Sequence, residues 1–144
     1  MKKLLVVGIT CAMASGLSFA AFAQTHSAQD EITTAHAHAV LASTADTVEI
    51  GHTHLHHVIN CLVGPKGSGF DAKAADPCKG QGNGAIPDSA SNHAVHRKLK
   101  KALAEAQSGL KANELATIHS DAGKLAAKLK SADGSDSAKA SSGW

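Results

Sequence analysis

Hydrophobic positions recur at helical spacing in four segments of the chain. The segment 27–43 carries apolar and small side chains on one stripe, and the segment that ends near residue 63 does the same with Val48, Leu55, Ile59 and Leu62. Two later segments, 91–107 and 111–131, repeat the pattern, with Leu and Ala on one face and lysines outside it. This periodicity predicts four amphipathic helices.

Polar residues that favour helix starts separate the predicted helices. Asp46 or Thr47 can cap the second helix, and Ser91 or Asn92 can cap the third. Because the break at 44–47 is weak, one long helix through it is the competing interpretation. Ser108 and Gly109 separate the last two helices. The sequence therefore predicts an all-α protein, an up-down four-helix bundle.

The segment 64–91 interrupts the helical pattern between the second and third helices. It holds all three prolines and the alternating glycines of 80–84, which indicates a long structured loop. Cys61 and Cys78 bracket its first half, and in an exported chain we expect them to form a disulfide. Closing this loop would stabilise the fold by about 3 kcal/mol. The alternative is that both thiolates bind a metal.

The first 23 residues have the features of a secretory signal peptide. Met1-Lys2-Lys3 is a basic start, residues 4–14 are an apolar run, and Ala21-Phe22-Ala23 is a small-x-small cleavage pattern. A membrane anchor is the weaker interpretation, because the apolar run is short and broken. We expect a signal peptide at 1–23, a helical domain at 24–131, a disordered tail at 132–144, and a periplasmic or secreted protein without a stable membrane anchor after cleavage.

Composition narrows the classes of partner. The formal net charge of the whole chain is +2, and loss of Lys2 and Lys3 with the signal would bring it to zero. Tyr is absent and Trp144 is the only Trp, so neither charge nor aromatic side chains favour nucleic-acid binding. The core must then be built from Ala, Leu, Val and Ile, which suits close-packed helices.

Histidine is the residue that carries candidate chemistry, since four of the ten histidines fall within positions 52–57. Imidazole is the commonest protein ligand for metals. On a helical wheel, one histidine from each helix lies inside or at the edge of the apolar stripe, and one more follows a turn later, at similar heights in the bundle. These residues form the predicted five-histidine shell: His36, His52, His56, His96 and His119.

Two further histidines of the cluster, His54 and His57, are also candidate ligands, although the wheel places them and His38 on other faces. The alternative interpretation is structural. Histidines at helix boundaries can pack ring carbons inward and expose a nitrogen.

In the last two predicted helices, the motifs His93-Ala94-Val95-His96 and Ala116-Thr117-Ile118-His119-Ser120-Asp121-Ala122 are set among Leu, Ala and Lys. With the signal peptide and the size, these segments resemble the small periplasmic metal-binding proteins that form Ala-, Lys- and His-rich four-helix bundles. The resemblance implies binding of copper or another divalent ion in the periplasm, as a buffer.

The residue types also limit the ligand. Both methionines lie in the first 13 residues, so the exported chain offers no thioether site for Cu(I), whereas neutral imidazoles suit Cu(II), Ni(II) and Zn(II), with Cu(II) favoured by affinity. Haem between two histidines is an alternative. Only one glutamate lies three residues before a histidine, Glu49 before His52, whereas a di-iron carboxylate site needs two such pairs. No nucleophile-base set is evident, so we expect binding without turnover. A third hypothesis is an interaction or stress protein that uses the 64–91 loop, and the sequence identifies no protein partner.

Overall fold

The computed structural model describes residues 28–134, and helices are the only regular secondary structure in this part of the chain. Its four long helices are α1 (Ala28–Ser43), α2 (Val48–Val63), α4 (His93–Gly109) and α5 (Leu115–Ala132). A short helix, α3 (Ala85–Asp88), lies between α2 and α4. The predicted all-α class is confirmed. The predicted signal peptide and most of the predicted tail lie outside the described residues.

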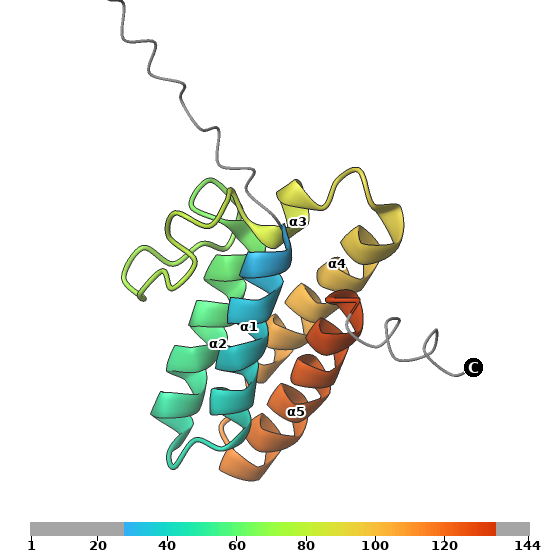
Figure 1. Ribbon diagram of the computed structural model, residues 1–144. Coiled ribbons are helices and arrows are strands. Elements are labelled where there is room, and N and C mark those ends of the chain that lie inside the picture. The colour runs from blue at the N-terminus through green and yellow to red at the C-terminus, as the bar shows by residue number, and fades with distance from the viewer. Residues whose placement is uncertain (1–27, 135–144) are drawn as a thin grey trace, which may run out of the picture.

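The long helices pack as a bundle in which α1 contacts α2 and α5, while α4 contacts α5 and α2 (Figure 1). The core consists mostly of small and branched side chains from all four, as the composition predicts: Ala35, Ala39, Leu55, Val58, Leu62, Leu99, Ala102, Ile118, Leu125 and Leu129. Within residues 28–134, no helix is long and apolar enough to cross a membrane.

Side-chain caps explain where two helices begin. The hydroxyl of Thr47 accepts a hydrogen bond from the backbone N–H of Ile50, at 3.2 Å, and Asn92 caps α4 in the same way through the N–H of Val95. These bonds satisfy backbone donors that the first helical turn leaves without partners. The cap at Thr47 shows that α1 and α2 are separate helices rather than one.

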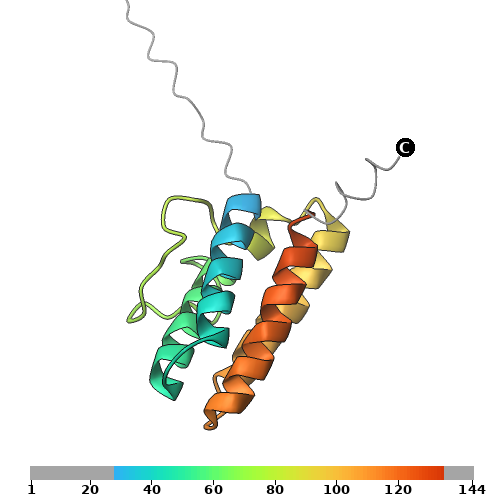
Figure 2. The same ribbon diagram turned by 60° about the horizontal axis from the view of Figure 1, so that its bottom comes forward.

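The segment between α2 and α4 differs from the prediction in one respect, because it contains α3. A helix of four residues is too short to show periodicity in the sequence. Pro87 is its third residue, and a proline is tolerated there because the first turn has no intrahelical acceptor for its nitrogen. Residues 64–84, which precede α3, lie on the α2 side of the bundle (Figure 2).

Several interactions attach this segment to the bundle. The predicted disulfide is confirmed, with Cys61 and Cys78 joined across 5.2 Å between their Cα atoms. The fully buried Asn60 side chain donates to the carbonyls of Asp71 and Ala75 and accepts the N–H of Asp71. On α1, the buried carboxylate of Glu31 accepts the N–H of Gly84 at 2.7 Å. The segment is therefore fixed at several points along its length.

Two helical glycines have opposite roles, and this difference gives a prediction. A Cβ atom at Gly123 on α5 would meet nothing within 4 Å, whereas one at Gly51 on α2 would lie 2.8 Å from Cγ2 of the buried Ile118. We expect Gly123→Ala to stabilise the fold by about 1 kcal/mol through helix propensity. The same change at Gly51 should destabilise it by about 1–3 kcal/mol through overpacking. Chemical denaturation measures both, and equal signs for the two variants would contradict this account.

Candidate metal centre

A cluster of three histidines lies on the seam between α1 and α2. His54 and His57 are three residues apart on α2 and so project from one face of that helix. His38 projects toward them from α1, which packs alongside. All three side chains are half-buried. We call His38, His54 and His57 the histidine triad.

The ring nitrogens of the triad converge on His38. Its Nδ1 atom lies 3.1 Å from Nδ1 of His54 and 3.3 Å from Nδ1 of His57. The ring centroids are 4.7–5.6 Å apart, and His57 meets both other rings edge-on. Within residues 28–134, this is the only group of three or more potential metal-ligating side chains whose ligand atoms all lie within 4.8 Å of one another.

Hydrogen bonds between the three rings cannot fully account for this arrangement. Each Nδ1 of a neutral imidazole carries either one proton or one lone pair, in the plane of the ring. The Nδ1 atom of His38 therefore cannot form two well-directed bonds to His54 and His57 at once. A cation placed among the three nitrogens would accept all three lone pairs, so the geometry suits a metal better than a proton.

The local environment also keeps the triad neutral. Burial, followed by the like charges of His57 and His54, lowers the pKa of His38 from 6.5 to about 4. Burial likewise lowers the pKa of His54, and burial together with His54 and His56 lowers the pKa of His57. Neutral imidazoles have the lone pairs that metal ions require, and these remain available at neutral pH.

The lowered pKa values predict acid sensitivity of the metal-free fold. Between about pH 6.5 and pH 4, the unfolded chain binds protons that folded His38 does not, so stability falls as the pH falls through this window. We expect the thermal midpoint, measured in chelator, to drop from pH 7 to pH 5. The drop should be smaller in His38→Gln, which removes the main titrating group. An equal drop in both proteins would show that His38 does not couple folding to pH.

The structure does not assemble the five-histidine shell that the sequence predicts. Three of its members bond to backbone carbonyls in different parts of the molecule: His52 to Ala112, at 2.9 Å, His119 to Ala45, at 2.7 Å, and His96 to Ile86, at 3.0 Å. His56 pairs instead with the carboxylate of Asp71, at 3.4 Å, and His36 is half-buried on α1 outside the triad. Their positions fit the structural interpretation, since His52 and His119 each join one interhelical turn to a helix of the other pair.

Two predicted ligands, His54 and His57, lie together in the triad, and the third member, His38, is not among the predicted ligands. The apolar stripes do not point to His38, because the half-buried triad lies beside them on the seam between α1 and α2. The position of the turn between α1 and α2 could have identified His38 as the third ligand. His38 lies six residues before Thr44, and His54 lies seven residues after Thr47, so two helices folded back at this turn bring these positions side by side.

No protein-family model, no curated protein and no solved structure matches the chain, so the triad and the fold around it are the basis for inferring its function.

Proposed function

We propose that this chain is an exported protein, periplasmic or secreted, that binds one divalent transition-metal ion through His38, His54 and His57. An up-down four-helix bundle is its scaffold, and it acts as a metal buffer or carrier. The observation that carries the proposal is the convergence of the three imidazoles, with Nδ1 atoms 3.1 Å and 3.3 Å apart.

These separations match the distances between ligands on a single ion. Metal-nitrogen bonds of about 2.0–2.1 Å place neighbouring nitrogens about 3.3–3.4 Å apart in a tetrahedral site, and about 2.8–3.0 Å apart in a square-planar one. The observed values lie between these two limits. The third separation, between the ligand nitrogens of His54 and His57, is no more than 4.8 Å, so these two rings would have to close on the ion.

Ligand type and the affinity order favour Cu(II). The triad offers imidazole nitrogens alone, and the thiols of Cys61 and Cys78 are consumed by the disulfide. By the intrinsic affinity order of divalent ions, a site built of imidazole nitrogens generally binds Cu(II) more tightly than Ni(II) or Zn(II). We therefore propose Cu(II) as the preferred ion, with Ni(II) and Zn(II) as weaker ligands.

The proposal is one of binding without turnover. The triad contains no carboxylate that could serve as a general base beside a metal-bound water. Haem fits less well than a single ion, because a macrocycle needs a gap between two axial imidazoles. The rings of His38 and His57 are instead in edge contact, with centroids 4.7 Å apart.

Calorimetric titration of the metal-free protein with Cu(II), Ni(II) and Zn(II) tests the proposal. We expect one ion per chain. Cu(II) should bind most tightly, and Ni(II) and Zn(II) should follow in either order. Binding should weaken below about pH 6, because protons compete for the imidazoles. Absence of binding by all three ions at neutral pH would refute the proposal. It would leave the interaction or stress protein as the remaining hypothesis.

A further inference from the structure

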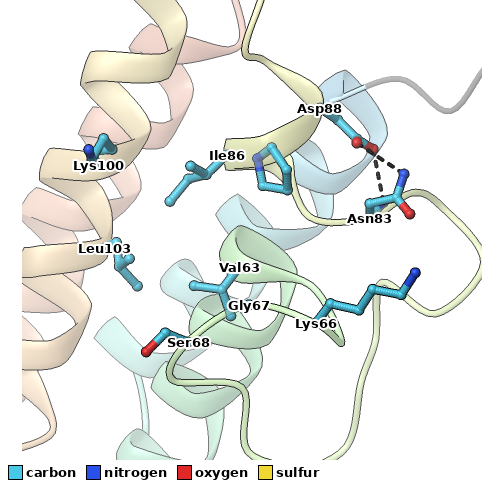
Figure 3. Close-up of a pocket in the computed structure, with 10 residues that line it drawn as sticks. Val63, Lys66, Gly67, Ser68, Asn83, Ile86, Asp88, Lys100 and Leu103 are labelled. Carbon is cyan, nitrogen blue, oxygen red and sulfur yellow. Dashed lines mark hydrogen bonds between the residues drawn. The ribbon is translucent and has the colours of Figure 1, made fainter.

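A pocket that contains none of the triad residues lies between α2, α3 and α4. It has a volume of about 590 Å³, within the range of about 300–1,000 Å³ that small-molecule sites occupy. The side chains of Val63, Ile86 and Leu103 face this space from the three different helices (Figure 3). A hydrocarbon group could therefore contact an apolar surface on three sides.

The walls of the pocket are held in place by contacts that the triad does not need. Gly64 and Gly84 adopt positive φ and lie so close that a Cβ at Gly64 would be 1.7 Å from the carbonyl oxygen of Asn83. The ring of His96 bonds to the carbonyl of Ile86 and so joins α3 to α4. Preformed walls of this kind reduce the ordering cost of binding a ligand.

The charges around the pocket favour an anion. Lys66 and Lys100 lie at opposite sides of it, both exposed, and within residues 28–134 neither forms an ion pair (Figure 3). Asp88 is the one acidic residue of the lining, and Asn83 holds its carboxylate through both a backbone and a side-chain donor, at 2.9 Å and 3.2 Å. The mouth therefore has an excess of positive charge.

We propose that this pocket binds a medium-chain monocarboxylate. The hydrocarbon chain would lie on Val63, Ile86 and Leu103, and the carboxylate would pair with Lys66 or Lys100 at the rim. Both lysines have long exposed side chains, so either ammonium group can turn toward the ligand. The inference uses none of the triad residues and does not depend on metal binding.

Titration of the full-length, disulfide-bonded protein with decanoate tests this proposal, and decyltrimethylammonium is the matched probe of opposite charge. We expect decanoate to bind about tenfold or more tightly than the cation, because two rim lysines attract one and repel the other. Shortening decanoate by one methylene should weaken binding up to about fourfold. Equal affinity for the two head groups, or no saturable binding of decanoate, would overturn the proposal.

Variants locate the binding. Leu103→Glu should abolish decanoate binding, because it places a negative charge on the apolar wall. Leu110→Glu changes a half-buried leucine at the C-cap of α4, outside the pocket, and should leave binding intact. Lys66→Ala with Lys100→Ala should weaken binding about five- to tenfold, and Lys101→Ala should have no effect. Circular dichroism checks folding. His38→Ala should bind decanoate normally, so failure of the metal proposal and failure of this one are separable.

Discussion

Replacing His38 by alanine is expected to weaken Cu(II) binding by about 100-fold or more. His38 is the residue whose Nδ1 lies near both other nitrogens of the triad, so its loss leaves two ligands on a single helix. Removing even an outer-shell partner of a metal ligand costs about 10–100-fold in affinity, and removing a ligand should cost at least as much. Calorimetric titration of the purified variant with Cu(II) measures the change.

Controls for this variant come from the other histidines. His52→Ala, His96→Ala and His119→Ala remove rings that bond to backbone carbonyls, and these changes should leave the affinity for Cu(II) within a fewfold of the original. His54→Ala and His57→Ala should behave like His38→Ala. If the first set weakened binding and the triad variants did not, the site would be elsewhere and the proposed function would be wrong.

The His38→Ala variant also tests whether metal binding at the triad stabilises the folded state. An ion that binds only the folded state at 100 times its dissociation constant stabilises that state by about 2.7 kcal/mol. We therefore expect Cu(II) to raise the thermal midpoint of the original protein and to leave that of His38→Ala nearly unchanged. A metal-induced rise in both proteins would point to ion binding outside the triad.

The helices were predictable because their signals are local. Apolar spacing and the caps at Thr47 and Asn92 depend on residues within one or two turns, and the structure confirms them. The start of α5 was less accessible. It begins at Leu115 rather than near residue 111, because the N–H groups of Lys111 and Ala112 bond back to Ser108 and Gly109 in a turn. Such turns depend on competition between nearby backbone acceptors, which periodicity does not report.

The conformation of the 64–91 segment could not be predicted, because the residues that hold it in place are distant from it in sequence. Asn60 looks like an ordinary polar residue at the end of a helix, yet its amide holds two residues of the loop, Asp71 and Ala75. Glu31 reads as a favourable charge in the first turn of α1, yet its carboxylate binds the N–H of Gly84, 53 residues away. These contacts require the tertiary fold and leave no periodic trace.

The candidate site was only partly predictable, because it too depends on how two helices pack. Histidine density in positions 52–57 indicated metal chemistry and supplied His54 and His57. Choosing ligands by their place on the apolar stripe then favoured the wrong faces, because a site on a helix seam sits beside the stripe rather than within it. The partners that occupy the stripe edge, His52 and His119, instead satisfy carbonyls in two interhelical turns.

Loss of the disulfide should lower stability by about 3 kcal/mol. Cys61 and Cys78 are 17 residues apart, and the chain-entropy account of a crosslink gives this value for a loop of that length. In a domain of this size, the change should lower the thermal midpoint by more than about 10 °C. The double variant Cys61→Ala with Cys78→Ala, compared with the original protein by thermal and chemical denaturation, measures the effect.

Two controls separate the contribution of the crosslink from that of side-chain packing and locate the loss of stability. Both sulfur atoms are buried, so alanine also leaves small cavities, and the chemically reduced original protein is the control that lacks the crosslink but keeps the side-chain volume. Because Asn60 and Glu31 still hold parts of the segment, we expect hydrogen exchange to accelerate mainly around Cys78 and to change little in α1 and in the half of α2 that carries His54. Reduced protein as stable as the oxidised form would show that the bond contributes nothing to the fold, and uniform loss of protection would show that the loop and the helices unfold as one unit.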